Sequence, residues 1–295
     1  MRWTDDEVVK TRDLVLGGGG PVGLAWETGV IAGLAQAGVD LSKADRLFGT
    51  SAGSLLGARV RLSTDLAGLA APLLEPRPAA PGAPPPPASP GGLMQIIADA
   101  HAGGRDPVEV RRDFGRKALA AETMGSEAAF ALVEQFLGAP RSQPWPAPHL
   151  ACTAVDAESG VFRTLDSGTG ADLIASVAAS CAVPGLFPPV VIGRRPFIDG
   201  GFRSFTNADL ATGHDVVVVI AVQTAGAPAH IAGQLEREVA GLRADGAAVV
   251  LITPDAAADE AMGPNLMDFT RQADAARAGI AQAAREAAAV SAAWN

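Results

Sequence analysis

The chain has 295 residues, a formal net charge of -9 at pH 7 and 48% hydrophobic residues. It is therefore long enough for one large domain with a sizeable core. The acidic balance, without a run of Lys or Arg, argues against nucleic acid as a partner and gives no attraction to anionic membrane surfaces.

Three further features bear on the compartment. Neither Cys152 nor Cys181 lies in a C-x-x-C pattern, so we expect both to be reduced. The N-terminal segment MRWTDDEVVK lacks the apolar stretch of a signal peptide. The longest aliphatic run, residues 216–222, is far shorter than a membrane span. We therefore expect a cytoplasmic protein.

The first predicted strand, Leu14–Leu16, ends in four glycines and leads into a predicted helix over Leu24–Ala37. Gly29 and Gly33 recur in this helix at a spacing of four, which predicts that one face is pressed closely onto a sheet. A second strand, Arg46–Phe48, leads into the segment GTSAGS.

The next predicted helix, Ser54–Leu62, is followed by a change in composition. Residues 71–92 hold nine of the 22 prolines, a density that excludes both helix and sheet. Residues 93–138 are alanine-rich and predict helices. They form either a cap over one face or a peripheral insertion without a role at the site.

Alternating apolar residues return in two predicted strands, 149–155 and 161–165, which the turn at 156–160 joins as a hairpin. A helix to about residue 182 follows, and after a proline-containing loop comes a short strand over residues 196–199.

The last third of the chain predicts strands at 216–222 and 248–252 and a final helix from about Leu266. Strands and helices alternate along the chain without an internal repeat. The sequence therefore predicts one α/β domain, a three-layer α/β/α sandwich with a mainly parallel central sheet.

The glycine-rich loop has two interpretations. Gly18, Gly20 and Gly23 form a G-x-G-x-x-G pattern between a strand and a helix, which is the dinucleotide-binding fingerprint. However, Pro21 has no N–H to offer, and the end of the second strand lacks the acidic residue that would bind a ribose.

The second interpretation is an oxyanion hole, in which backbone N–H groups stabilise negative charge in an acyl-transfer transition state. Gly19 and Gly20 are the best-placed donors, with Gly18 nearby, since glycine lets a substrate approach the amides closely. This interpretation needs a nucleophile at the end of the adjacent strand.

Ser51 is predicted at that position. It lies in a G-x-S-x-G pattern with Gly49 and Gly53, between a strand and a helix, as in a nucleophile elbow. Three nearby or similar hydroxyl residues are better explained as turn or cap residues: Thr50, Ser54 and Ser180. A serine hydroxyl needs a base to take its proton.

No histidine is well placed for that role. His101 and His149 precede any late aspartate, and His230 lies in a loop ahead of a helix. His214 directly precedes the strand at 216–222, at its amino end, whereas sites in such sheets lie at carboxyl ends. A His214-dependent esterase nevertheless remains an alternative.

Asp199 is the remaining candidate base. It follows a strand in the segment FIDGG, and its small neighbours Gly200 and Gly201 leave the carboxylate uncovered. The alternative is an ordinary Asp-Gly turn. Burial would raise the pKa of this carboxyl and make it a more effective base.

Four segments occur in a fixed order: LVLGGGGPVGLAWETGV, GTSAGS, VAASCAVPGLFPPV and DGG. Together they resemble the patatin-like phospholipase family, over about residues 14–213. The resemblance implies a catalytic domain over these residues, with the proline-rich insertion at 71–92 and the helical cap at 93–138. The alternation of strands and helices predicts that residues 214–295, which carry little of the family signal, complete the same domain.

The resemblance also implies a Ser–Asp dyad without histidine that hydrolyses acyl esters, often of lipids, with no metal or cofactor. Ser51 would be the nucleophile, Asp199 its base, and Gly18, Gly19 and Gly20 the oxyanion hole. The other motif positions are Gly23, Gly49, Gly53, Gly200 and Gly201.

One position departs from the family pattern, because Val22 stands where many members carry Arg or Lys. The expected partner is an acyl-ester or lipid substrate, met in solution or at a transient membrane contact, and not a nucleic acid. Phospholipid, neutral lipid, thioester and small ester all fit. A nucleotide-binding or non-catalytic module that uses the glycine loop remains the other alternative.

Overall fold

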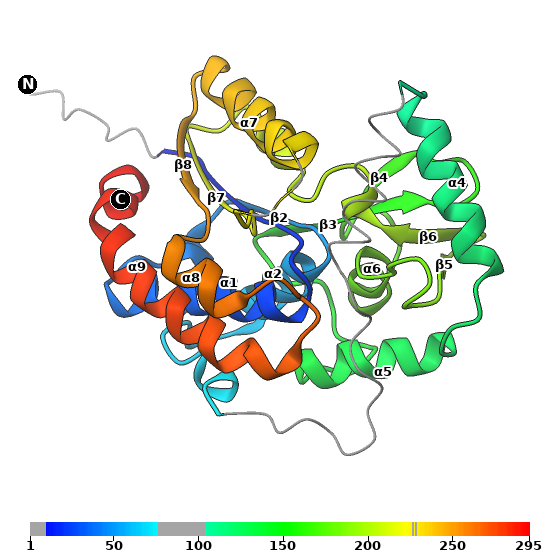
Figure 1. Cartoon of the computed structure of the whole chain (residues 1–295), viewed down its shortest axis with the longest axis horizontal. Helices are drawn as coiled ribbons and strands as arrows, with labels where there is room; N and C mark the ends of the chain where they lie inside the picture. The colour runs from blue at the N-terminus through cyan, green and yellow to red at the C-terminus, as the bar shows by residue number, and fades with distance from the viewer. Residues whose placement is uncertain (1–9, 76–103, 226, 228) are drawn as a thin grey trace, which may run out of the picture.

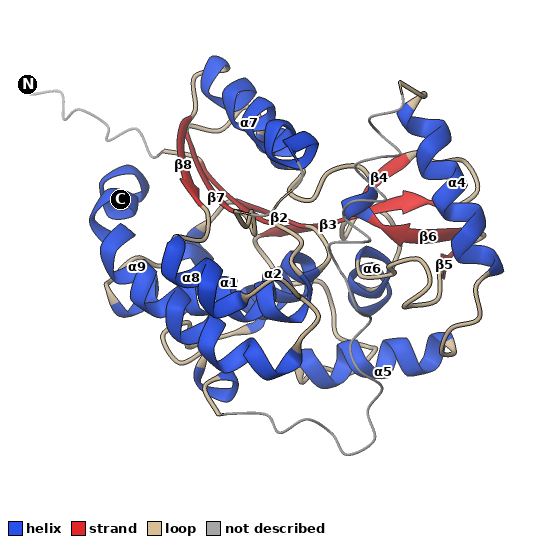
Figure 2. Cartoon of the chain, viewed as in Figure 1, coloured by secondary structure: helices blue, strands red, loops and turns tan. Residues whose placement is uncertain are grey.

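A computed structural model of the protein describes residues 10–75, 104–225, 227 and 229–295. Its eight strands form one sheet in the order β5-β6-β3-β2-β1-β7-β8, with β4 paired to β3 (Figure 2). The strands are β1 Arg12–Leu16, β2 Arg46–Gly49, β3 His149–Asp156, β4 Phe162–Leu165, β5 Val190–Ile192, β6 Arg195–Asp199, β7 Val216–Ile220 and β8 Ala248–Ile252.

Five neighbouring strands, β3-β2-β1-β7-β8, are parallel, while β4, β5 and β6 add antiparallel pairs at the β3 side. The helices are α1 Gly20–Gln36, α2 Ala52–Leu62, α4 Pro107–Ala120, α5 Ser126–Leu137, α6 Leu173–Ser180, α7 Ala229–Ala244, α8 Ala256–Met262 and α9 Gln272–Trp294. The predicted α/β class and mainly parallel sheet are confirmed, as is the β3–β4 hairpin.

Helices cover both faces of the sheet. Helices α1, α2, α6, α8 and α9 contribute to one core cluster, whereas α7 packs on the opposite face (Figure 1). Helix α4 packs near β3 and β6, and α5 lies against α2 and α6. The described part of the predicted cap, residues 104–138, is thus divided between two places. The rest of that segment, His101 included, and residues 76–92 lie outside the described residues.

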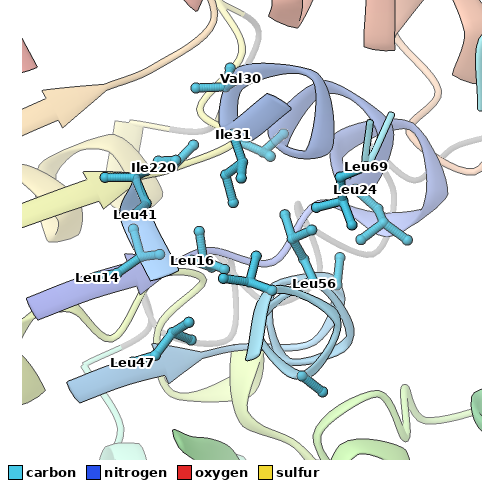
Figure 3. Packing of buried hydrophobic residues seen from close by; sticks show 14 of the residues in the cluster. Leu14, Leu16, Leu24, Val30, Ile31, Leu41, Leu47, Leu56, Leu69 and Ile220 are labelled. Atoms are coloured by element: carbon cyan, nitrogen blue, oxygen red, sulfur yellow. The ribbon is translucent and has the colours of Figure 1, made fainter. Parts of the chain in front are cut away.

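Side-chain alternation in β1 explains the apolar run of the first strand. Leu14 and Leu16 point into the cluster formed with α1 and α2, next to Leu47 of β2 (Figure 3). Val15 points to the other face, where it joins Val219 beneath α7. A strand buried on both faces carries no polar alternation.

The sequence predicted that the glycine face of α1 is pressed onto the sheet. That prediction is wrong, because this face packs on another helix. A Cβ added at Gly29 would lie 2.2 Å from the carbonyl oxygen of Ala276, and one at Gly33 would lie 2.7 Å from Cβ of Ala283. Both partners belong to α9. The small residues therefore allow the terminal helix to pack backbone-to-backbone on α1.

Three predicted helix starts are shifted. Helix α1 begins at Gly20, four residues early, because Pro21 fits the first helical turn. Helix α2 begins at Ala52. The final helix starts later than predicted, at Gln272, and Phe269 lies before it with 51% of its surface exposed.

Among the described residues, no helix combines the length and the apolar character that crossing a bilayer requires.

Candidate active site

Ser51 occupies the sharp turn between β2 and α2. Its backbone has φ 53° and ψ -118°, and among the described non-glycine residues only Asn207 shares a positive φ. Such a conformation costs about 1–3 kcal/mol and persists only where the surrounding structure fixes it.

The glycines two residues before and after Ser51 are required by packing. A Cβ at Gly49 would lie 2.6 Å from the carbonyl oxygen of Gly53, and a Cβ at Gly53 would lie 2.2 Å from that of Leu16. The G-x-S-x-G spacing is therefore a steric consequence of the tight strand–helix connection beside β1.

The register of the sheet places Asp199 level with Ser51. Gly49 pairs with Cys152, and Ala154, two residues further along β3, pairs with Asp199 at the end of β6. Ser51 also lies two residues beyond Gly49. The two segments therefore lie at the same end of the sheet, on either side of β3.

Asp199 is almost fully enclosed, with 3% of its surface exposed. Burial raises the pKa of its carboxyl from 3.8 to about 7, against the opposing effects of a side-chain hydrogen bond with Ser51 and one from the Gly201 N–H. The Gly201 nitrogen lies 2.7 Å from Oδ1. A carboxylate with a pKa near neutrality is suited to accept a proton at physiological pH.

The glycine loop offers two unengaged donors at the amino end of α1. The Gly18 N–H donates to the carbonyl oxygen of Phe205 at 2.7 Å. The N–H groups of Gly19 and Gly20 have no acceptor within the part of the chain that the structure describes. They lie at the helix end where the macrodipole favours negative charge. Of the three glycines predicted as oxyanion donors, Gly18 is therefore already engaged.

Both free amides sit where only glycine fits. A Cβ at Gly19 would lie 2.6 Å from Cγ2 of Val222, and Gly20 has φ 58°. The segment before α9 packs on the same loop, where a Cβ at Gly20 would lie 3.0 Å from the carbonyl oxygen of Leu266.

Two histidines lie at the amino ends of strands, away from Ser51. Nδ1 of His214 is 2.8 Å from Oδ1 of buried Asp13, beside the starts of β1 and β7. Nε2 of His149, the first residue of β3, is 3.2 Å from Oδ2 of Asp166.

Ser180, explained as a cap residue from the sequence, supports the elbow directly. Its Oγ accepts a hydrogen bond from the Ser51 N–H at 3.0 Å and lies 2.7 Å from Oγ of Ser54, which is also 2.7 Å from the carbonyl oxygen of Gly49. The next residue, Cys181, donates its thiol to the Ser51 carbonyl oxygen. Both cysteines are free. The short apolar helix α6 gave no signal for this role beyond its place in the VAASCAVPGLFPPV segment.

The glycine loop, Ser51 and Asp199 all lie in a region that matches a known protein family. The sequence profile of the patatin-like phospholipases matches residues 14–212, which is most of the chain and includes the glycine loop, Ser51 and Asp199. The chain belongs to the patatin-like phospholipase family. No curated protein matches its sequence.

Two solved structures are similar at low sequence identity. VipD from Legionella pneumophila shares 13% identity over 94% of this chain and 67% of its own, with a TM-score of 0.41. The type III effector protein ExoU shares 15% identity over 95% of this chain, with a TM-score of 0.39. This chain covers 53% of that ExoU chain, or about half of it.

Val22, the position at which the sequence was expected to depart from the family pattern, belongs to the core. Its side chain is fully buried in the core, and its N–H donates to the carbonyl oxygen of Leu266 at 3.0 Å. Val22 therefore serves packing in this protein.

Proposed function

We propose that this patatin-like protein is a serine acyl hydrolase that acts on carboxylic esters, with lipid esters as the substrate class that the family name indicates. One observation carries the proposal: Ser51, held in a strained turn, lies level with Asp199 in the register of the sheet, and burial raises the pKa of that carboxyl to about 7.

In the acylation step, Oγ of Ser51 attacks the ester carbonyl carbon while the Asp199 carboxylate takes the hydroxyl proton. The C=O electron pair moves to the oxygen, and the N–H groups of Gly19 and Gly20 stabilise the resulting oxyanion. Losing one such donor typically costs roughly 10²–10³ in rate.

Collapse of the tetrahedral intermediate breaks the bond to the alcohol, which leaves with the proton held by Asp199. In deacylation the water oxygen attacks the carbonyl carbon of the acyl-enzyme while Asp199 takes a proton from that water. The proton then passes to Oγ of Ser51 as the acid is released. The scheme needs no metal or cofactor.

The proposal is tested with a short-chain nitrophenyl ester and a fluorophosphonate probe. We expect the fluorophosphonate probe to leave Ser51→Ala unlabelled. Asp199→Asn should lower the turnover number roughly 10²- to 10⁴-fold. His214→Ala should keep its activity. Labelling of the Ser51→Ala protein at the wild-type rate would refute the nucleophile, and undiminished turnover by Asp199→Asn would refute the base.

Neither alternative is favoured by the geometry. A histidine-dependent esterase would need His214, which pairs with Asp13 at the opposite end of β1. A nucleotide site would need the loop amides, of which Gly18 is engaged and Pro21 has none. Thermal stabilisation by NAD or FAD would support the nucleotide-binding function and contradict the proposed acyl hydrolase.

A further inference from the structure

Asn207 combines two unusual properties. Its side chain is completely buried, and its backbone has φ 52°, a left-handed conformation that Asn tolerates better than most residues. It belongs to the loop between the short 3₁₀ helices Gly200–Phe202 and Ala208–Ala211, which follows the candidate base directly.

The side-chain amide of Asn207 joins the segments of the two candidate catalytic residues. Its Nδ2 lies 3.0 Å from Oγ1 of Thr50, the residue before Ser51. The same nitrogen lies 3.4 Å from the carbonyl oxygen of Gly200, the residue after Asp199, and 2.6 Å from that of Ser204. Thr50 is also fixed by Thr153 of the intervening strand β3, whose Oγ1 donates to it at 3.0 Å.

The loop of Asn207 also holds the glycine loop, because the Phe205 carbonyl oxygen accepts the Gly18 N–H. The loop is braced internally by Arg203 and anchored from outside by Glu238 of α7. Arg203 donates to Oδ1 of Asn207 at 2.8 Å and pairs with Asp209, and Oε2 of Glu238 in α7 accepts the Ala208 N–H at 2.9 Å. One anchored loop therefore contacts the nucleophile, base and oxyanion segments.

We propose that Asn207 is a positioning residue that fixes the Ser51 hydroxyl against Asp199 by tying Thr50 to Gly200; this inference rests on the proposed function. Asn207 has no contact with the reacting atoms and acts through Thr50. A misplacement of reacting groups by about 1 Å can cost about 100-fold in rate.

The test compares Asn207→Gly, which keeps the positive φ without strain, with Thr50→Val, which keeps the side-chain shape but lacks the hydroxyl. We expect each to lower kcat and the fluorophosphonate labelling rate roughly 10- to 100-fold, with KM changed by about twofold at most. Because both remove the same link, the double variant should be no slower than the slower single variant. Thr50→Ser restores the hydroxyl and should recover most of the rate.

Gln234→Met is the matched control, since Nε2 of Gln234 donates to the Arg203 carbonyl oxygen of the same loop at 2.9 Å but reaches neither Thr50 nor Gly200. It should keep kcat within about twofold of the wild type, as a change outside the link. Wild-type labelling by Asn207→Gly, or multiplied losses in the double variant, would overturn the inference. If Asn207→Gly does not fold, the comparison of Thr50→Val with Thr50→Ser tests the inference. Equal kcat values for these two variants would overturn it. An unlabelled wild-type protein would overturn the proposed function itself, together with this inference.

Discussion

Asp199→Asn should stabilise the protein while it removes the candidate base. Burial raises the pKa of the Asp199 carboxyl from 3.8 to about 7. Between these values the native state keeps a proton that the unfolded chain releases, so this carboxyl makes the folded protein less stable as the pH rises through the window. Asparagine has the same size and carries no charge, and its oxygen can still accept the Gly201 N–H.

The magnitude follows from the width of that window. At about 1.4 kcal/mol per pH unit, the rise in pKa from 3.8 to about 7 corresponds to about 4 kcal/mol of destabilisation above pH 7. Two pH units of the window lie between pH 5 and pH 7. The advantage of the Asn variant in free energy of unfolding should therefore be about 3 kcal/mol larger at pH 8 than at pH 5.

Urea unfolding of both proteins at pH 5 and pH 8 measures this difference, because every other titrating group is common to the pair. Asp274→Asn is the control for removing a carboxylate: that side chain is 70% exposed and pairs with Arg277 on the surface of α9, and such exposed pairs contribute only about 0–1 kcal/mol. An advantage of Asp199→Asn that is equal at the two pH values would refute the raised pKa.

Three further predictions concern the elbow and the pH dependence of turnover. Ser51→Gly should abolish turnover and raise the free energy of unfolding by about 1 kcal/mol, because glycine adopts φ 53° without strain; an unchanged stability in urea unfolding would contradict the strain. Gly53→Ala should lower the free energy of unfolding by roughly 2 kcal/mol or more, since the new Cβ would lie 2.2 Å from the Leu16 carbonyl oxygen. A variant as stable as the wild type in urea unfolding would show that the turn can relax. For the wild type, kcat/KM of a nitrophenyl ester should fall about tenfold per pH unit below about pH 7, as Asp199 becomes protonated; a flat profile between pH 5 and pH 8 would exclude this carboxyl as the base.

The fold was largely predictable because buried parallel strands are short apolar runs that end in glycine or polar turns. The runs at Leu14–Leu16 and 216–222 both lie in strands inside the sheet, β1 and β7, although β7 ends at Ile220. Helix starts were less predictable, since Gly20 and Pro21 are poor helix formers that nevertheless occupy the first turn of α1. The packing of α9 on α1 was not predicted, because close helix–helix and helix–sheet contacts both require small residues. A glycine such as Gly29 is therefore compatible with either contact.

Within the site, local motifs pointed to the candidate residues but not to their connections. The positions of Ser51 and Asp199 followed from strand ends and flanking glycines. Their common level depends on the pairing of β3 with β6, an antiparallel contact that no local pattern specifies. Asn207 gave no sequence signal, because a buried αL asparagine in a polar loop looks like any turn residue.

The unfavourable features of this molecule concentrate at one edge of the sheet. A non-glycine residue at positive φ, a buried carboxyl and two amides that find no acceptor among the described residues would each lower stability elsewhere in a fold. Here Ser180, Thr50 and the loop of Asn207 hold them in a fixed arrangement through hydrogen bonds to backbone and hydroxyl groups. Such an arrangement is expected where donors and a base must be placed before the reaction begins. The stability gained by Asp199→Asn would then measure part of what the fold gives up for that placement.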